Sequence, residues 1–372
     1  MIKLLTIIGA RPQIIKAAAI SRAVREKFAG QVEEHILHTG QHYDANMSEV
    51  FFRELGIPEP DYNLHVGSGS HGVQTARIIE GIESVLTEQH YDGVIVYGDT
   101  NSTLAAAVAA SKIHVPVFHV EAGLRSFNMG MPEEINRIVC DQLSSVLFTP
   151  TLTGLRNLEA EGFSSIKSRV RFADRRGQKV VLSGDVMYDN SMYFSAMADV
   201  QSNIIERLGL RYRQFVLATI HRPANTDNPE NLRSIFRALN DIAEQHQMDV
   251  VLPLHPRTRK MIGDLSERVR IIEPASFFEI IRLEKNAAIV MTDSGGVQKE
   301  AFFYGTPCVI LRPETEWVEI VEAGAGIIAD ADYERIMAAY EALVNKPVQF
   351  PAVFGDGHAS EKIIQEILMY LR

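Results

Sequence analysis

Residues 288–300 read AIVMTDSGGVQKE, a short apolar run that passes through two glycines into an expected helix. The run at 288–291 is unbroken, as in a parallel strand covered on both faces. Gly295 and Gly296 allow a ligand to approach the backbone closely, and the amides that open a helix attract anions. The stretch therefore predicts a strand–turn–helix unit that cradles a diphosphate. An ordinary glycine-rich turn is the simpler alternative.

The same alternation of predicted strands and helices continues in both directions along the chain, and it forms two separate series. Short apolar runs alternate with longer helical patterns, for example at residues 13–27, 103–111 and 231–246. Such alternation is typical of doubly wound parallel sheets. We predict an α/β fold of two Rossmann-like domains with a cleft between them, in preference to one extended sheet. The predicted strands are 4–8, 35–38, 94–96, 115–120, 146–148 and 180–182, then 215–219, 250–252, 269–272, 288–291, 308–311 and 326–328.

Length and composition agree with two ordinary globular domains. The chain has 372 residues, 46% hydrophobic and 23% charged, with 37 basic against 47 acidic side chains and a formal net charge of −10. Two domains are the expectation at this length. An acidic chain does not coat nucleic acid or an anionic membrane through bulk charge. We expect domains at 1–186 and 187–356, with a last segment, 357–372, that forms a helix.

Cysteine usage and the N-terminus argue for a soluble cytoplasmic protein. Cys140 and Cys308 are too few for a disulfide scaffold or a four-cysteine zinc site, and both lie among apolar residues. We expect buried free thiols. No signal peptide or membrane span is recognisable, and no set of side chains has metal-ligand spacing.

Cations follow the first predicted strand. Arg11 and Lys16 stand near the start of the first expected helix, a position that already favours anions. The surrounding residues match neither a Walker loop nor Gly-x-Gly-x-x-Gly, which argues against nucleoside triphosphate and NAD. Two solvated surface cations are the simpler alternative.

Three carboxylates follow later strands of the first series. Asp99 comes directly after one strand, while Glu121 and Glu133 flank a short loop after the next. Ligands bind beyond the carboxyl ends of parallel strands. Crowded carboxylates hold each other's pKa values apart, which suits acid–base chemistry. The simpler alternatives are a helix cap for Asp99 and an Arg–Glu network through Arg125 and Arg137.

Histidine and arginine stand together at strand ends of the second series. His221 precedes Arg222, His255 lies two residues before Arg257, and Arg312 follows a further strand. A lone histidine is usually structural. Two His–Arg pairs at equivalent strand ends suit phosphate binding or proton transfer.

Taken together, these motifs resemble those of the non-hydrolysing UDP-N-acetylglucosamine 2-epimerases. The matching segments stand in the family's order over nearly the whole chain: Gly9–Pro12 with Lys16, Gly98–Thr100, Val120–Arg125, Pro132–Glu134, His221–Arg222, Asp293–Glu300 and Gly355–Gly357. The resemblance implies the two-domain glycosyltransferase-B fold, with the active site in the inter-domain cleft and the last helix crossing back to the first domain. It also implies a homodimer that needs no cofactor.

The activity implied is interconversion of UDP-GlcNAc and UDP-ManNAc, by elimination of UDP to 2-acetamidoglucal and re-addition. Asp99, Glu121 and Glu133 match the family's acid–base carboxylates, and His221 matches the group that helps the diphosphate leave. Among the substrate contacts, Glu300 resembles the carboxylate that binds the ribose. The implied substrate contacts are Arg11, Lys16, Arg125, Asn128, Arg137, Arg222, His255, Ser294, Gly295, Gly296, Glu300 and Arg312.

Three departures from the family pattern bear on the sugar and on regulation. The loop at 126–131 is short, and the family's Thr-Glu-Arg-Pro-Glu is replaced by TEWVE at 315–319. Both features resemble the subgroup that acts on UDP-2,3-diacetamido-2,3-dideoxyglucuronate, which is the alternative substrate. Residues 41–44 read QHYD where members activated by a second substrate molecule have Gln-His-Arg, which argues against such activation. A glycosyltransferase or a hydrolysing relative is a further alternative.

Overall fold

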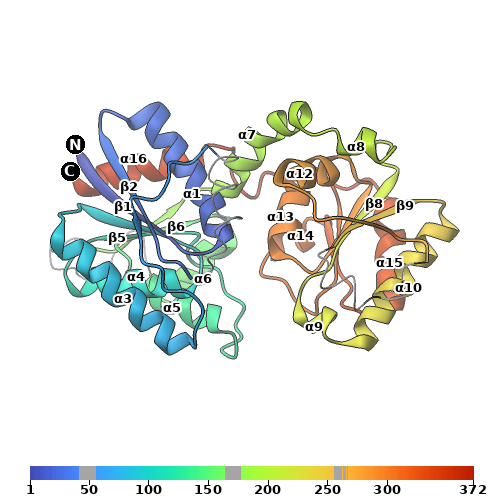
Figure 1. Ribbon diagram of the computed structural model, residues 1–372, viewed down its shortest axis with the longest axis horizontal. Coiled ribbons are helices and arrows are strands. Elements are labelled where there is room, and N and C mark those ends of the chain that lie inside the picture. Colours follow the sequence, from blue (N-terminus) through green and yellow to red (C-terminus); the bar gives the residue numbers. More distant parts are fainter. Residues whose placement is uncertain (42–55, 164–176, 255–261, 263–264, 266) are drawn as a thin grey trace. The chain divides into compact units, whose positions relative to one another are not determined.

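The computed structural model describes residues 1–41, 56–163, 177–254, 262, 265 and 267–372. These residues form two compact units (Figure 1). Unit 1 comprises Met1–Asn190 and Val353–Arg372, and unit 2 comprises Ser191–Ala352. Each has its own parallel sheet with helices on both faces, so the predicted α/β class with two sheets is confirmed.

Unit 1 is built on a seven-stranded sheet in the order β3-β2-β1-β4-β5-β6-β7, in which every neighbouring pair is parallel. The strands β1, β4, β5 and β6 are almost wholly buried, which explains their unbroken apolar sequences. The two-residue β3 was not predicted, because a pairing this short leaves no periodic signal. The strands are β1 (Ile2–Ile8), β2 (Val32–His38), β3 (Tyr62–Asn63), β4 (Gly93–Tyr97), β5 (Val117–Val120), β6 (Val146–Thr149) and β7 (Lys179–Leu182).

The helices of unit 1 follow the predicted alternation, with one local difference. The helix expected at 13–27 begins earlier, at Arg11, and its last turn is the π-helix η1 (Val24–Phe28). Alanines of α4 pack on β1 and β4, where small side chains let helix and sheet approach closely. The helices are α1 (Arg11–Ala23), α3 (His71–Glu88), α4 (Asn101–Lys112), α5 (Pro132–Leu143), α6 (Leu152–Ala160) and α16 (Ala359–Leu371), while α7 (Val186–Gln201) begins in unit 1 and continues into unit 2.

Unit 2 has a six-stranded parallel sheet in the order β10-β9-β8-β11-β12-β13. Helix α10 buries Leu232, Ile235, Phe236, Leu239 and Ile242, a stripe with helical spacing that packs into the core of this unit. The strands are β8 (Phe215–Thr219), β9 (Asp249–Pro253), β10 (Arg270–Ile272), β11 (Ile289–Thr292), β12 (Cys308–Ile310) and β13 (Gly326–Ile328). The helices are α8 (Ile204–Arg207), α9 (Pro223–Thr226), α10 (Pro229–Gln245), α12 (Phe277–Asn286), α13 (Gly295–Phe303), α14 (Val318–Glu322) and α15 (Tyr333–Val344).

Each sheet reverses its strand order at one point. In unit 1 the chain builds outward from β1 to β2 on one side and from β4 to β7 on the other. In unit 2 the reversal lies between β8 and β11. The loops that leave the two central strands diverge at such a point, which opens a crevice at their carboxyl ends. The fold therefore marks the ends of β1 and β4, and of β8 and β11, as binding positions.

Two further features of the fold concern the cysteines and the possibility of a membrane-spanning helix. Cys140 and Cys308 are free and buried, as predicted. Among the described residues, no helix has both the length and the apolar character needed to cross a membrane.

The C-terminal helix α16 is anchored to unit 1 by one buried carboxylate. Asp189 on α7 accepts hydrogen bonds from the amides of Ala359 (3.0 Å) and Ser360 (2.8 Å) and from the Ser360 hydroxyl (2.7 Å). These amides open α16 and have no partner within their own helix. Asp189 therefore caps α16 from a distant part of the chain.

We predict that Asp189→Ala lowers the free energy of unfolding by about 2–4 kcal/mol, because two buried amides lose their acceptor. Ser360→Ala removes only the hydroxyl contact and should cost about 1 kcal/mol. Urea unfolding followed by far-UV circular dichroism measures both. Equal losses in the two variants would contradict the capping role.

Candidate active site

An acidic side chain stands at the reversal point of unit 1. Asp99 follows β4, and the next residue, Thr100, caps α4 by accepting a hydrogen bond from the Thr103 amide (3.3 Å). Asp99 is therefore not the helix cap that the simpler alternative proposed. Its carboxylate pairs with the Arg137 guanidinium of α5.

Glu121 lies beside Asp99, in a backbone conformation that few side chains adopt. Its φ is 71°, in the left-handed region, where a residue other than glycine is strained and often functional. Its carboxylate pairs with Lys16, which α1 brings in from the end of β1. Both side chains are about nine-tenths buried, at 11% and 10% exposed. Lys16 is thus part of the acidic cluster rather than a solvated surface cation.

Gly98 allows this cluster to close. Its φ is 61°, and a Cβ at this position would stand 3.1 Å from the Lys16 ammonium nitrogen and 3.4 Å from a Glu121 carboxylate oxygen. A larger residue would be strained and would crowd the ion pair. The turn at Gly98, directly after β4, therefore allows Asp99, Glu121 and Lys16 to lie close together.

The environment of Asp99 shifts the pKa of its carboxyl group upward. Burial raises the pKa of the carboxyl group and nearby Glu121 adds to the rise, while Arg137 and Lys16 oppose it. About 29% of the side chain remains exposed, so water moderates the rise. The result is a raised pKa, as expected for a group that exchanges a proton with a ligand.

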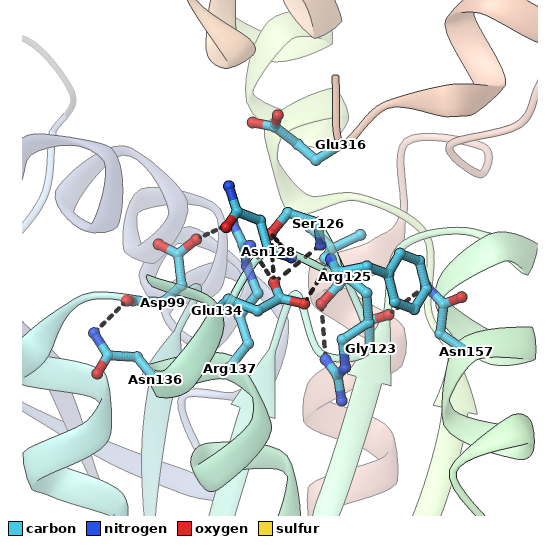
Figure 2. A network of polar contacts seen from close by, with 12 residues as sticks. Asp99, Gly123, Arg125, Ser126, Asn128, Glu134, Asn136, Arg137, Asn157 and Glu316 are labelled. Atoms are coloured by element: carbon cyan, nitrogen blue, oxygen red, sulfur yellow. Dashed lines mark hydrogen bonds and ion pairs between the residues drawn. The ribbon is translucent and has the colours of Figure 1, made fainter. Parts of the chain in front are cut away.

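A second carboxylate holds the loop beside this cluster (Figure 2). Glu134 on α5 is 1% exposed and accepts hydrogen bonds from the amides of Ser126 and Phe127 (2.9 Å each) and from Arg137 (2.8 Å). Burial alone would raise the pKa of Glu134, but these donors outweigh it, so the pKa lies below its usual value. Sequence reasoning missed this residue, although its i,i+3 spacing from Arg137 was a usable signal.

Glu133 lies one residue earlier, on the first turn of α5, and points away from this network. Its side chain is exposed, and no residue in the described part of the chain forms an ion pair or hydrogen bond with it. Asn128 is also exposed, on the neighbouring loop, where its side chain accepts a hydrogen bond from the Gly130 amide (3.0 Å). The catalytic role of Glu133 stays a prediction.

Arg125 was expected to bind the substrate, and the structure places it in an internal ion-pair network. Its guanidinium is 1% exposed and donates to Glu161 (2.6 and 2.8 Å) and to Asp141 (2.7 Å). Binding of the substrate by Arg125 stays a prediction. The simpler alternative of an internal network is correct here, and Arg137 belongs to a similar network with Asp99 and Glu134.

In unit 2 a histidine–carboxylate pair marks the reversal point. His221 follows β8, and its Nδ1 lies 2.9 Å from a carboxylate oxygen of Asp293, which follows β11. Asp293 is fully buried and also accepts from the Arg222 amide and the Asn225 side chain (3.1 Å each). Burial opposes ionisation, but these partners hold the pKa of Asp293 below its usual value. The His221 side chain is 61% exposed. Because Nδ1 faces Asp293, the other ring nitrogen of His221 lies on the far side of the ring from this carboxylate.

The predicted anion cradle follows Asp293 directly. Ser294 caps α13, and Gly295 is its first residue. A Cβ on Gly295 would lie only 2.4 Å from a carboxylate oxygen of Glu316, so a larger residue there would displace the Glu316 side chain. The next residue, Gly296, is open, with its nearest neighbour 3.8 Å from a built Cβ. Glu300 lies further along the same helix, and Gly305 (φ 66°) ends it as predicted.

The remaining predicted contacts are dispersed. Arg11 is exposed at the start of α1, and Arg222 is partly exposed beside His221. Arg312 is 7% exposed at the side chain and donates to Glu316 (3.0 Å). His255 and the QHYD segment beyond Gln41 lie outside the described residues. In the part of the chain that is described, no group of three or more His, Cys, Asp or Glu side chains is placed to hold a metal ion.

The sequence profile of the UDP-N-acetylglucosamine 2-epimerases matches residues 25–368. The chain belongs to this family. It is 48% identical, over 98% of both chains, to the UDP-2,3-diacetamido-2,3-dideoxy-D-glucuronate 2-epimerase of Pseudomonas aeruginosa. It is 39% identical, over 99% of both chains, to the UDP-N-acetylglucosamine 2-epimerase of Methanocaldococcus jannaschii.

Solved structures agree with the family. The crystal structure of the Methanocaldococcus jannaschii enzyme with UDP-GlcNAc and UDP has a TM-score of 0.85 at 39% identity, covering 99% of this chain and 100% of that one. A plant glycosyltransferase from Phytolacca americana shares the fold at 10% identity, with a TM-score of 0.60. The predicted glycosyltransferase-B fold is confirmed.

We predict that Glu134→Gln destabilises the protein by about 2–4 kcal/mol at neutral pH, because a buried charged acceptor of several hydrogen bonds is lost. A carboxyl whose folded pKa is depressed stabilises above its unfolded pKa of about 4.3, and this stabilisation is lost as pH falls through the folded pKa. The deficit of the variant should therefore shrink below about pH 4. Urea unfolding at pH 7 and in acid measures it.

Glu133→Gln is the matched control, since it makes the same change on the exposed neighbour. Its stability should stay within about 0.5 kcal/mol of the wild type at both pH values. A deficit of Glu134→Gln that did not vary with pH would rule out the depressed pKa as its cause.

Proposed function

We propose that this chain is a non-hydrolysing 2-epimerase of a UDP-sugar. The observation that carries the proposal is the cluster of Asp99, Glu121 and Lys16 at the reversal point of unit 1. It combines a carboxyl group with a raised pKa, Asp99, with one that lies against an ammonium group, Glu121. Family membership and the names of the relatives support the same reaction class.

The reaction needs both removal of a carbon-bound proton and departure of a diphosphate. A base takes the proton from C2, the C2–H electrons form the C1–C2 double bond, and the C1–O bond breaks to release UDP. Re-addition of UDP with return of a proton to the other face of C2 gives the epimer. The proton is not activated by a neighbouring carbonyl, so a positioned base and a stabilised leaving group are both required.

We assign the acid–base work to unit 1. Glu121 is held beside Lys16 and suits a charged role, whereas Asp99 has a raised pKa and suits a group that carries a proton. Glu133 is exposed on the adjacent helix turn and free to meet a ligand. The three carboxylates differ in environment, which is what separate acid and base roles require.

We assign the diphosphate to unit 2. The amides at the start of α13, the open approach at Gly296 and the Ser294 hydroxyl form an anion-binding turn. His221, oriented by Asp293, supports the negative charge that develops on the leaving group. Glu300 on the same helix would accept hydrogen bonds from the ribose hydroxyls.

Two sugars are candidates. UDP-GlcNAc is the substrate named for most of the similar proteins, whereas the 48% identical relative is named for the diacetamido-glucuronate derivative. That identity, together with the short loop at 126–131, favours the uronate as the substrate to test first. A homodimer and a cytoplasmic location stay predictions.

The deciding experiment is proton NMR in deuterium oxide with each UDP-sugar. We expect deuterium at C2 and appearance of the C2 epimer with one of them, without accumulation of free sugar. Absence of C2 exchange with both sugars would overturn the proposal. Free sugar and UDP at equilibrium would instead identify a hydrolase, and acceptor-dependent transfer without exchange would identify a glycosyltransferase.

Variants in the two units should separate chemistry from binding. Glu133→Gln should lower the exchange rate at least about 100-fold while the Kd for UDP stays within about twofold, because general base catalysis alone contributes about 10²–10⁴. Glu300→Ala should weaken UDP binding about tenfold or more, the value of a lost charged hydrogen bond. Exchange kinetics and calorimetric titration with UDP measure both, and each variant is the control for the other. Retained turnover in Glu133→Gln would remove Glu133 from the catalytic set.

A further inference from the structure

A fully buried histidine lies beneath the acidic cluster of unit 1. His119 on β5 is 0% exposed, and both of its ring nitrogens have partners. Nε2 lies 2.8 Å from the carbonyl oxygen of Gly98, and Nδ1 lies 2.7 Å from a carboxylate oxygen of Asp141 on α5. A carbonyl oxygen only accepts hydrogen bonds, so Nε2 must carry a proton.

The second nitrogen also carries a proton. The other oxygen of Asp141 accepts hydrogen bonds from Arg125 (2.7 Å) and from the Gly123 amide (3.2 Å), so this side chain is an acceptor at both oxygens. Nδ1 then donates to it, and the ring is an imidazolium. The group of His119, Asp141, Arg125 and Glu161 has two positive and two negative charges, which balance in the interior. Burial opposes the charged ring, but Cys140 and Asp141 raise the pKa of His119 well above its ordinary value.

This pair ties together the two turns that carry the acidic side chains. Through the His119 ring it holds the Gly98 carbonyl, which belongs to the peptide group joining Gly98 to Asp99. Through Asp141 it holds the Gly123 amide, two residues after Glu121. Gly98 itself packs against the Lys16–Glu121 ion pair, so a shift of its peptide would disturb both carboxylates.

We propose that His119 and Asp141 form a buried imidazolium–carboxylate pair whose function is to position Asp99 and Glu121 relative to each other. They are positioning residues, since neither reaches a surface that a substrate can contact. The proposal rests on the proposed 2-epimerase function, in which those two carboxylates act on the sugar. A displacement of about 1 Å in such a group can cost about 10²-fold in rate.

Two amide substitutions distinguish positioning from simple packing. In His119→Gln the amide nitrogen comes near the position of Nε2 and keeps a donor for the Gly98 carbonyl. In His119→Asn it comes near the position of Nδ1 and keeps a donor for Asp141. Both variants lose the positive charge and one of the two contacts.

We expect His119→Gln to keep kcat for C2 exchange within about tenfold of the wild type, and His119→Asn to lose about 100-fold. The Kd for UDP should change less than twofold in both, because the anion cradle belongs to unit 2. Thermal unfolding of the two variants is the control for stability. If Asn retained as much kcat as Gln, or if the Kd for UDP moved together with kcat, the positioning role would be overturned.

Nitrogen-15 NMR of the histidine-labelled wild type tests the pair without any activity measurement. We expect one ring that keeps both nitrogens protonated throughout the neutral range, because the pKa of His119 is raised well above its ordinary value. His38 is the internal control, because its Nδ1 accepts from the Gly40 amide (2.9 Å) and burial lowers its pKa to about 4. That ring should remain neutral throughout the neutral range.

The two measurements fail separately. Absence of a doubly protonated ring overturns the imidazolium–carboxylate pair whatever the enzyme does. A wild type without C2 exchange on either UDP-sugar overturns the proposed function, while the spectrum still decides the state of His119. Both expected results together confirm the pair and its role.

Discussion

The parallel alignment of β1, β4 and β5 is the constraint on which the acidic cluster depends. Because these strands run in the same direction and in register, their carboxyl ends lie at one edge of the sheet. Lys16, Asp99 and Glu121 come from three separate segments, yet each follows the end of one of these strands. An antiparallel neighbour would send its residues to the opposite edge, and no local sequence change could bring them back.

Unit 1 holds several charged side chains close together and largely away from water. The buried charges around the acidic cluster lie against opposite ones: Lys16 against Glu121, Arg137 between Asp99 and Glu134, and Arg125 between Asp141 and Glu161. Removing one member of such a set leaves its partner uncompensated, which is more costly than the pair is favourable. The same pairing fixes the side chains in place before any ligand arrives, and electrostatic catalysis requires that preorganisation. Unit 2 differs, since the anion site proposed there consists mainly of backbone amides at a helix start, with the His221–Asp293 pair beside it.

Sequence reasoning succeeded where the signal is local. Unbroken apolar runs identified nearly all strands, and the two glycines after Ser294 identified the strand–turn–helix unit that begins α13. It failed where a partner lies far along the chain. Asp141, Glu134 and Asp293 resemble ordinary helix or loop carboxylates until the fold places His119, Ser126 and His221 against them. The ion pair of Arg125 was hidden for the same reason, because its partner Glu161 is 36 residues away.

By itself, the sequence determined the α/β class, the two series of strands, the glycine positions at tight turns and the family. These features depend on the periodicity of apolar residues and on short motifs, which can be recognised within single segments of the chain. Only the tertiary structure decided which charged side chains remain exposed and which neutralise one another inside the protein. That distinction depends on distances between residues remote in the chain and on how much water each one keeps, and neither quantity is encoded in any single segment.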